Sequence, residues 1–175
     1  MPEFSDSQYK YFQLQLSDRK LFRYFWQFWS NYAFLIFAAA GLMIVIEPMF
    51  EAVRWTIVLK SAISFLVARG IIVTTINWLY KKQRPYQKFR FKPLTSRFFS
   101  FHTTIPNSFP SRHTTAYFSV ATVVAFYIPA LGAMLMIVSL LAAGARIVLG
   151  YHWAADIVGG IVIGSVIGVM AVYLV

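Results

Sequence analysis

Two histidines and one aspartate in the second half of the chain are the residues best suited to chemistry. His152 and Asp156 stand four residues apart in the stretch ARIVLGYHWAAD, and His113 stands in the stretch NSFPSRHT. Residues four apart share one face of a helix, so we expect the Asp156 carboxylate to accept a hydrogen bond from one imidazole nitrogen of His152. The other nitrogen is then left as a nucleophile or a base.

Cationic and hydroxyl side chains accompany these residues. Arg84 directly precedes a proline, and Arg146 lies six residues before His152. The planar guanidinium group of arginine can bind two oxygens of one phosphate group. Pro110 followed by Ser111 predicts a helix start, and the free backbone N–H groups of a helix start bind phosphate. The pattern therefore indicates chemistry on a phosphate ester, with cations placed to stabilise the developing negative charge.

The composition indicates a membrane protein that binds anions. The 175 residues are 59% hydrophobic and only 13% charged, whereas a small soluble domain needs about 25% charged residues. Sixteen Lys and Arg against six Asp and Glu give a net charge of +10, which favours phospholipid headgroups or phosphate esters as partners. Because the chain has no cysteine, disulfides and thiolate metal sites are excluded.

Hydropathy predicts an all-α fold, a multi-pass transmembrane helical bundle within a single domain, 1–175. An interfacial helix in the N-terminal segment 1–30, starting near Ser17, is expected to lead into the first span. Arg69 lies too deep in the second span to reach water and should face the bundle interior. A small-residue stripe in the last span predicts close helix packing. About five spans are expected, near 24–46, 55–80, 112–128, 131–149 and 153–175.

The segment 81–113 is predicted to be a basic active-site loop. It carries no acidic residue and holds eight of the sixteen basic residues. With five spans, this loop and the turn at 150–153 lie on the same face of the membrane, so the motifs can meet. The eight basic residues are Lys81, Lys82, Arg84, Lys88, Arg90, Lys92, Arg97 and Arg112.

Together, the motifs R-P, P-S-x-H and R-x5-H-x3-D, each at the same-face end of a span, resemble those of the type-2 phosphatidic-acid phosphatase superfamily. The resemblance covers about residues 20–175. The stretches INWLYKKQRPY and SFPSRHT are most similar to the bacterial undecaprenyl-diphosphatase branch. The resemblance implies a membrane-integral lipid phosphate phosphatase that requires no metal and no other cofactor.

The resemblance also implies a role for each motif residue. His152 would attack phosphorus and become phosphohistidine, and Asp156 would orient and charge-stabilise it. His113 would protonate the leaving oxygen and later activate water. The implied substrate is an isoprenoid carrier such as undecaprenyl diphosphate; phosphatidic acid and phosphatidylglycerol phosphate are alternatives. The residues implied to hold phosphate oxygens are Arg84, Arg146 and Ser111.

Three positions depart from the pattern of the superfamily, which is K-x6-R-P, P-S-G-H and S-R-x5-H-x3-D. Asn77 stands where the first lysine belongs; Lys81, one turn further on, is the first candidate to replace it and Lys82 the second. Arg112 replaces a glycine and adds a cation for a second phosphate. Ala145 replaces a serine. The missing lysine leaves a catalytically impaired, lipid-binding relative as an alternative.

Two further functions compete with the phosphatase. His113, His152 and Asp156 would also suit a catalytic zinc ion, because three N/O ligands with an open position are typical of such sites. The arginine-rich surroundings favour an oxyanion over a dication. Arg69 and the other charges within the membrane would also suit a transporter, although the chain has no inverted repeat.

The expected partners are a membrane lipid substrate and the lipid bilayer. The alternation of basic and aromatic residues over 88–92 is a pattern that can bind single-stranded nucleic acid. Next to membrane spans, anionic headgroups are the better partner for it, and no nucleic acid is expected. The resemblance implies the cytoplasmic (inner) membrane, with the active site on the extracytoplasmic face. The excess of basic residues on the active-site side favours the opposite orientation.

Overall fold

The computed structural model describes residues 20–90 and 107–175, which form helices and no β-strand. The predicted helix start near Ser17 lies outside these residues. The all-α prediction is confirmed for the part that is described. The long elements are α2 (Lys20–Ile46), α3 (Arg54–Phe65), α6 (Arg112–Tyr127), α7 (Pro129–Val148) and α8 (Ala154–Leu174). The short ones are η1 (Pro48–Phe50), the π-helix η2 (Leu66–Ile72), α4 (Val73–Leu79) and α5 (Pro85–Lys88).

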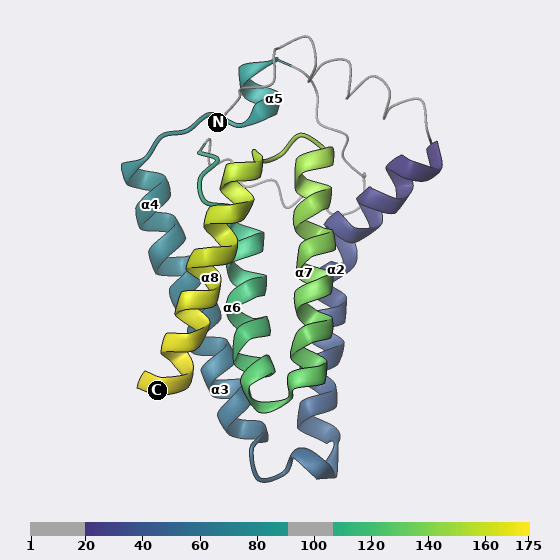
Figure 1. The fold of residues 1–175 in the computed structure, drawn as a ribbon, viewed down its shortest axis with the longest axis vertical. Helices are drawn as coiled ribbons and strands as arrows, with labels where there is room; N and C mark the ends of the chain where they lie inside the picture. Colours follow the sequence, from purple (N-terminus) through teal and green to yellow (C-terminus); the bar gives the residue numbers. More distant parts are fainter. Residues whose placement is uncertain (1–19, 91–106) are drawn as a thin grey trace.

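Among residues 20–90 and 107–175, four helices are long and apolar enough to cross a membrane, namely α2, the continuous helix Arg54–Leu79, α7 and α8. The chain is therefore a multi-pass membrane protein by helix length and composition. The remaining predicted span, near 112–128, corresponds to α6, whose 16 residues fall short of the roughly 20 that a span needs. It packs against α3, α7 and α8 in the middle of the bundle (Figure 1). Four of the five predicted spans thus have the required length.

The N-terminal part of the described chain differs from the prediction for 1–30. Residues from Lys20 onward belong to one helix, α2, instead of a separate interfacial helix followed by a span. No proline interrupts the sequence between Lys20 and Ile46, so nothing ends the helix at the expected junction. The N-terminal turns of α2 lean away from the bundle (Figure 1), and Leu21 and Tyr24 are exposed there.

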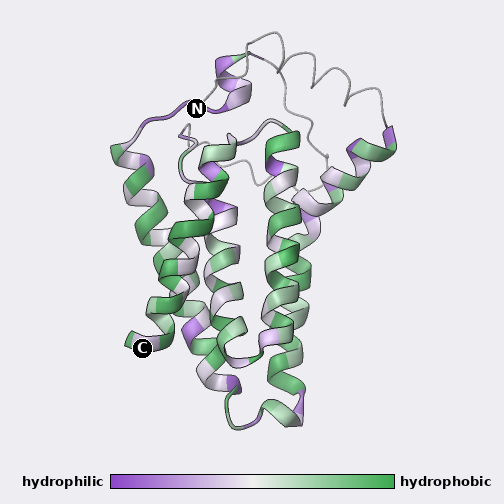
Figure 2. Cartoon of the chain, in the orientation of Figure 1, coloured by the Kyte–Doolittle hydropathy of each residue, from purple (hydrophilic) through white to green (hydrophobic). Residues whose placement is uncertain are grey.

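The motif-bearing ends of the helices lie together. Helix α4 ends, α6 begins, α7 ends and α8 begins at the same end of the bundle, next to α5 (Figure 1). Hydrophobic residues cover most of the long helices, and hydrophilic residues gather at their ends, above all at this one (Figure 2). Within the described residues, the two ends of the predicted loop, 81–90 and 107–113, thus lie at the same end of the bundle as the turn at 150–153 (Figure 1). We call this end of the bundle the polar end.

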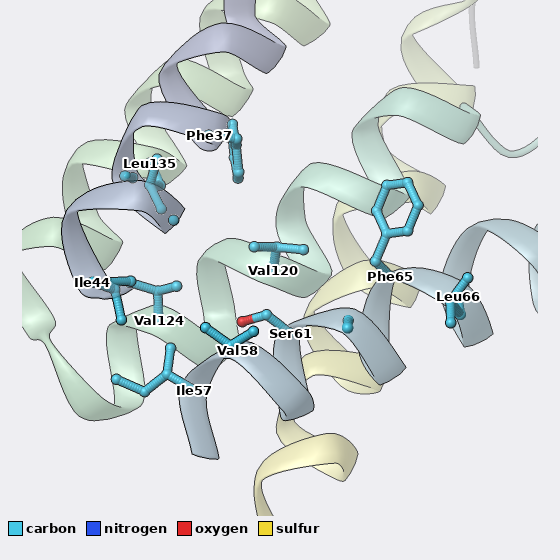
Figure 3. A pocket seen from close by; sticks show the side chains of 13 residues that line it. Phe37, Ile44, Ile57, Val58, Ser61, Phe65, Leu66, Val120, Val124 and Leu135 are labelled. Atoms are coloured by element: carbon cyan, nitrogen blue, oxygen red, sulfur yellow. The ribbon is translucent and has the colours of Figure 1, made fainter. Parts of the chain in front are cut away.

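An apolar cavity lies within the membrane part of the bundle, between α2, α3 and α6. Its volume is about 400 Å³, and Phe37, Val120 and Phe65 are among the side chains that line it (Figure 3). Phe37 also stacks on Tyr117 with 4.8 Å between ring centroids, and the Tyr117 ring lies 6.2 Å from that of His113. The cavity is thus separated from a motif histidine by one pair of aromatic rings.

Helix α8 approaches α6 closely along its small-residue stripe. A Cβ atom added to Gly164 would lie 2.4 Å from the Thr115 carbonyl oxygen, and one added to Gly168 would lie 2.6 Å from that of Ser119. Because these contacts are with backbone, a side chain at either glycine would push the helices apart. The expected close packing is confirmed, and it fixes the first turn of α8 against the start of α6.

We expect Gly164→Ala to destabilise the protein by about 1–3 kcal/mol, the usual cost of overpacking a rigid contact. Thermal unfolding of the detergent-purified protein measures this change. Gly41→Ala is the matched control, because no heavy atom lies within 4 Å of a Cβ placed there. The control should be as stable as the unmodified protein or more so, since alanine favours helix over glycine. Equal stability of both variants would contradict the close packing.

Candidate functional site

The Asp156 carboxylate is completely buried at the polar end, in the first turn of α8. Its Oδ1 atom accepts a hydrogen bond from Lys82 Nζ at 2.8 Å. Its Oδ2 atom accepts one from the Trp153 backbone N–H at 2.9 Å and another from the Ser108 hydroxyl. A buried carboxylate is stable only when it is paired and hydrogen-bonded. These three donors come from three separate segments, so the carboxylate ties the segments together.

His152 lies in the turn before α8, and its imidazole is oriented by backbone. Helix α8 starts at Ala154, so His152 and Asp156 do not lie on one helical face as predicted. The Nδ1 atom lies 3.0 Å from the Ser108 carbonyl oxygen, to which it donates, and 3.6 Å from Asp156 Oδ2. Asp156 therefore acts on this ring by charge and through Ser108 rather than by a short hydrogen bond. With the proton on Nδ1, the Nε2 atom carries the free lone pair.

The surroundings keep His152 uncharged. Burial lowers its pKa from the ordinary 6.5 to about 4, and the positive charges of Arg84 and Arg146 act in the same direction. The interaction with Asp156 opposes this shift without overcoming it. At pH 7 the imidazole is therefore neutral, which is the form that a nitrogen nucleophile requires.

A tight turn fixes the distance between Arg146 and His152. Gly150 has φ 81°, in the left-handed region that favours glycine after a helix. This turn directs the backbone N–H groups of Tyr151 and His152 to the Arg146 carbonyl oxygen, at 2.9 and 3.2 Å. The spacing R-x5-H thus has a structural cause, because the arginine's own backbone holds the residue that follows the turn.

The two motif arginines are held in different ways. Arg146 Nη2 donates to the Ser30 carbonyl oxygen in α2 at 3.1 Å, and its guanidinium lies 5.5 Å from the Tyr151 ring centroid. Arg84 precedes α5, and burial lowers its pKa from the usual value. Its Nε is buried and has no hydrogen-bond partner among residues 20–90 and 107–175. An anion in the site would supply that partner.

The start of α6 carries the P-S-x-H motif. Ser111 is the residue before the helix, as predicted; it is fully buried, and its hydroxyl accepts a hydrogen bond from Thr114 at 2.9 Å. Arg112 follows, and its Nη2 lies 3.4 Å from Thr74 Oγ1. The charges of Arg146 and Arg84, and the His152 ring, act on His113. The helix start, the two histidines and the arginines therefore occupy one site.

The lysine that contacts the site is Lys82, the second candidate from the sequence, and not Lys81, the first. Lys81, the first candidate for the missing motif lysine, is exposed, whereas Lys82 binds Asp156. Asn77, at the motif position itself, is buried, and its side-chain amide donates to the Val73 carbonyl oxygen at 2.8 Å. Ser108 was missed altogether. Its role in contacting His152 depends on a backbone carbonyl, for which the sequence has no signal.

The zinc alternative finds no support in this arrangement. Within residues 20–90 and 107–175, no group of three or more His, Cys, Asp or Glu side chains lies close enough to hold a metal ion. The carboxylate that such a site would need is occupied by Lys82, Ser108 and the Trp153 backbone. The guanidinium groups around it suit an oxyanion.

Known proteins resemble the chain over its motif-bearing part. A family model described as the PAP2 superfamily matches residues 58–175. The putative undecaprenyl-diphosphatase YbjG of Escherichia coli (strain K12) is 28% identical over 140 residues, which is 75% of this chain and 67% of that protein. The undecaprenyl-diphosphatase BcrC of Bacillus subtilis (strain 168) is 37% identical over 71 residues, which is 38% of this chain and 37% of that protein.

We expect Lys82→Met to lower kcat/KM by about 10- to 100-fold, the usual effect of losing one hydrogen bond to a charged group. Lys81→Met should lower it much less, because Lys81 is exposed. Phosphate release by the two purified variants, matched in residue type and neighbours in the chain, measures the difference. A larger loss in the Lys81 variant would restore Lys81 as the lysine of the site.

Proposed function

Because the chain belongs to the PAP2 superfamily, we propose that it is a metal-independent lipid phosphatase that works through a phosphohistidine intermediate. The observation that carries this proposal is the buried, neutral His152, whose Nδ1 is bound to a carbonyl oxygen and whose Nε2 is free among arginines. The alternative of a catalytically impaired relative rests on Asn77. It is weakened by Lys82, which brings a cation to the site from another position.

In the first step, Nε2 of His152 attacks phosphorus. An N–P bond forms, the bond from phosphorus to the leaving oxygen breaks, and His113 gives its proton to that oxygen. The imidazole gains positive charge in this step, and the nearby Asp156 carboxylate stabilises it, as the 3.6 Å separation allows. The Ser108 carbonyl keeps the ring oriented throughout.

In the second step, His113 takes a proton from water, and the resulting hydroxide attacks phosphorus. The N–P bond breaks, inorganic phosphate is released, and His152 returns to its neutral form. Negative charge on the phosphoryl oxygens builds up in both steps. Arg84, Arg146, Ser111 and the free N–H groups at the start of α6 are the groups that stabilise it.

The substrate we propose is a lipid diphosphate, of which undecaprenyl diphosphate is an example. Both relatives are named undecaprenyl-diphosphatases, and Arg112 adds a cation beyond those that one phosphate needs. The apolar cavity close to the Phe37–Tyr117 pair supports a substrate with a long apolar chain. Phosphatidic acid and phosphatidylglycerol phosphate are the alternatives to be compared in the same assay.

Phosphate release from these lipids by the detergent-purified protein, with EDTA present, tests the proposal. We expect release from undecaprenyl diphosphate that is abolished in His152→Ala, inhibited by vanadate and unaffected by the chelator. The reason is that the variant lacks the nitrogen that is proposed to form the N–P bond.

The matched control is His102→Ala, which changes a histidine outside the three motifs and should retain activity. Undiminished release by His152→Ala would contradict the mechanism. Activity lost in EDTA and restored by zinc would favour a metal enzyme instead.

We place the protein in the cytoplasmic membrane with the polar end on the extracytoplasmic face. The opposite end carries Glu47, Glu51 and Arg54 among its charged residues. The excess of basic residues at the polar end would favour a cytoplasmic location. Several of those residues serve the site, however, so they are not a measure of orientation. A lipid diphosphatase of this branch is expected to act on the outer face.

Single cysteines can test the orientation, because the natural sequence has none. Arg90→Cys places a thiol at the exposed polar end, and Glu47→Cys places one at the opposite end. A membrane-impermeant maleimide should label the first in intact cells and the second only after permeabilisation. The reverse pattern would place the site on the cytoplasmic face.

A further inference from the structure

Arg69 is a cation within the second span that the mechanism above does not use. It lies in the π-helix η2, ten residues before the end of the helix Arg54–Leu79, or about 15 Å along the helix. Arginine within a membrane span is costly, and it usually marks a functional site. Short π-helical segments within α-helices are also frequent at functional sites.

The structure links the Arg69 segment to the P-S-x-H motif through Thr74. The Thr74 hydroxyl donates to the Arg69 carbonyl oxygen at 3.3 Å, and the same oxygen of Thr74 lies 3.4 Å from Arg112 Nη2. The wider turn of the π-helix brings residue 69 into range of residue 74, five positions on. The backbone of Arg69 and the guanidinium of Arg112, the first residue of α6, therefore meet at the same Thr74 hydroxyl.

The charge of Arg69 acts on three groups of the site. It affects Arg112, His113 and Arg146. The main charge effects on His152 come instead from Arg84, Asp156 and Arg146. Arg69 thus acts on His113, which donates the proton to the leaving group, and it is not among the main charges that act on His152.

Neither Arg69 nor Arg112 is paired with an acidic residue in the described part of the chain. Within the described residues, Glu51 pairs with Arg54 at the other end of the helix, and Asp156 is bound by Lys82; no ion pair includes Arg69 or Arg112. The Arg112 Nε atom is buried, and no described residue is its hydrogen-bond partner. Two like charges held close together repel unless an anion lies between them.

We propose that Arg69 and Arg112 together bind the phosphate of the leaving group, so that the site selects lipid diphosphates over lipid monophosphates. This inference rests on the proposed function. When His152 attacks the terminal phosphorus of a diphosphate, the departing group is a lipid monophosphate, and its charge develops beside His113. When the substrate is a monophosphate, the departing group is a neutral alcohol and gains nothing from the two cations. Arg69 is a specificity residue in this scheme.

The test compares undecaprenyl diphosphate with undecaprenyl phosphate, which carry the same chain. Arg69→Gln should lower kcat/KM for the diphosphate by about 10- to 100-fold, the usual effect of losing a hydrogen bond to a charged group. It should change kcat/KM for the monophosphate by less than about threefold. Arg69→Lys, which retains the charge, should keep part of the preference. The control is Arg54→Gln, the same substitution at the other end of the same helix.

Binding of methylenediphosphonate, which is not hydrolysed, provides a readout that does not need turnover. It should raise the unfolding temperature of the unmodified protein more than phosphate does, and Arg69→Gln should lose that difference. Equal losses on both substrates, or an unchanged difference in binding, would overturn the inference. Failure of the proposed function is distinct, because it would appear as phosphate release that does not depend on His152.

Discussion

The buried carboxylate of Asp156 joins segments that are far apart in the chain. It binds Lys82 from the loop after α4, Ser108 from the segment before α6 and the backbone of Trp153 at the start of α8. The Asp156 carbonyl oxygen also accepts the Ser111 N–H at 3.1 Å. Removing one partner of a buried charge typically costs about 3–5 kcal/mol, so the segments must keep these positions together. The same contacts place the Ser108 carbonyl against His152.

Apart from Asp156, the described residues of the site carry positive charge that no described carboxylate balances. Asp156 is already bound, and the described arginines at the polar end have no second carboxylate to pair with. Because like charges repel, an anion bound among these arginines would reduce their mutual repulsion. Such an excess of positive charge suits a site that binds phosphate, because the arginines stabilise the negative charge of the bound group. It also explains why a dication is a poor occupant.

Part of this arrangement could be predicted from the sequence. The motif residues His113, His152 and Asp156 were found from residue type and spacing, and the parity of the spans placed them on one face. The predicted helical contact between His152 and Asp156 was wrong in its geometry, because α8 starts two residues after His152. The separate N-terminal interfacial helix was wrong for the described residues, because α2 is continuous. Element boundaries depend on local turns, which periodicity identifies poorly.

The sequence by itself determined the membrane class of the chain, the apolar spans, and the residue types that meet at the polar end. Hydropathy and motif spacing are local properties, and they can be read without knowing which segments touch. Only the tertiary structure decided that Lys82, 74 residues away, binds Asp156, and that the Ser108 carbonyl, 44 residues away, orients His152. Every residue has a backbone carbonyl, and neighbouring lysines are chemically identical. Their roles are therefore decided by packing, which brings one of them to the carboxylate and leaves the other exposed.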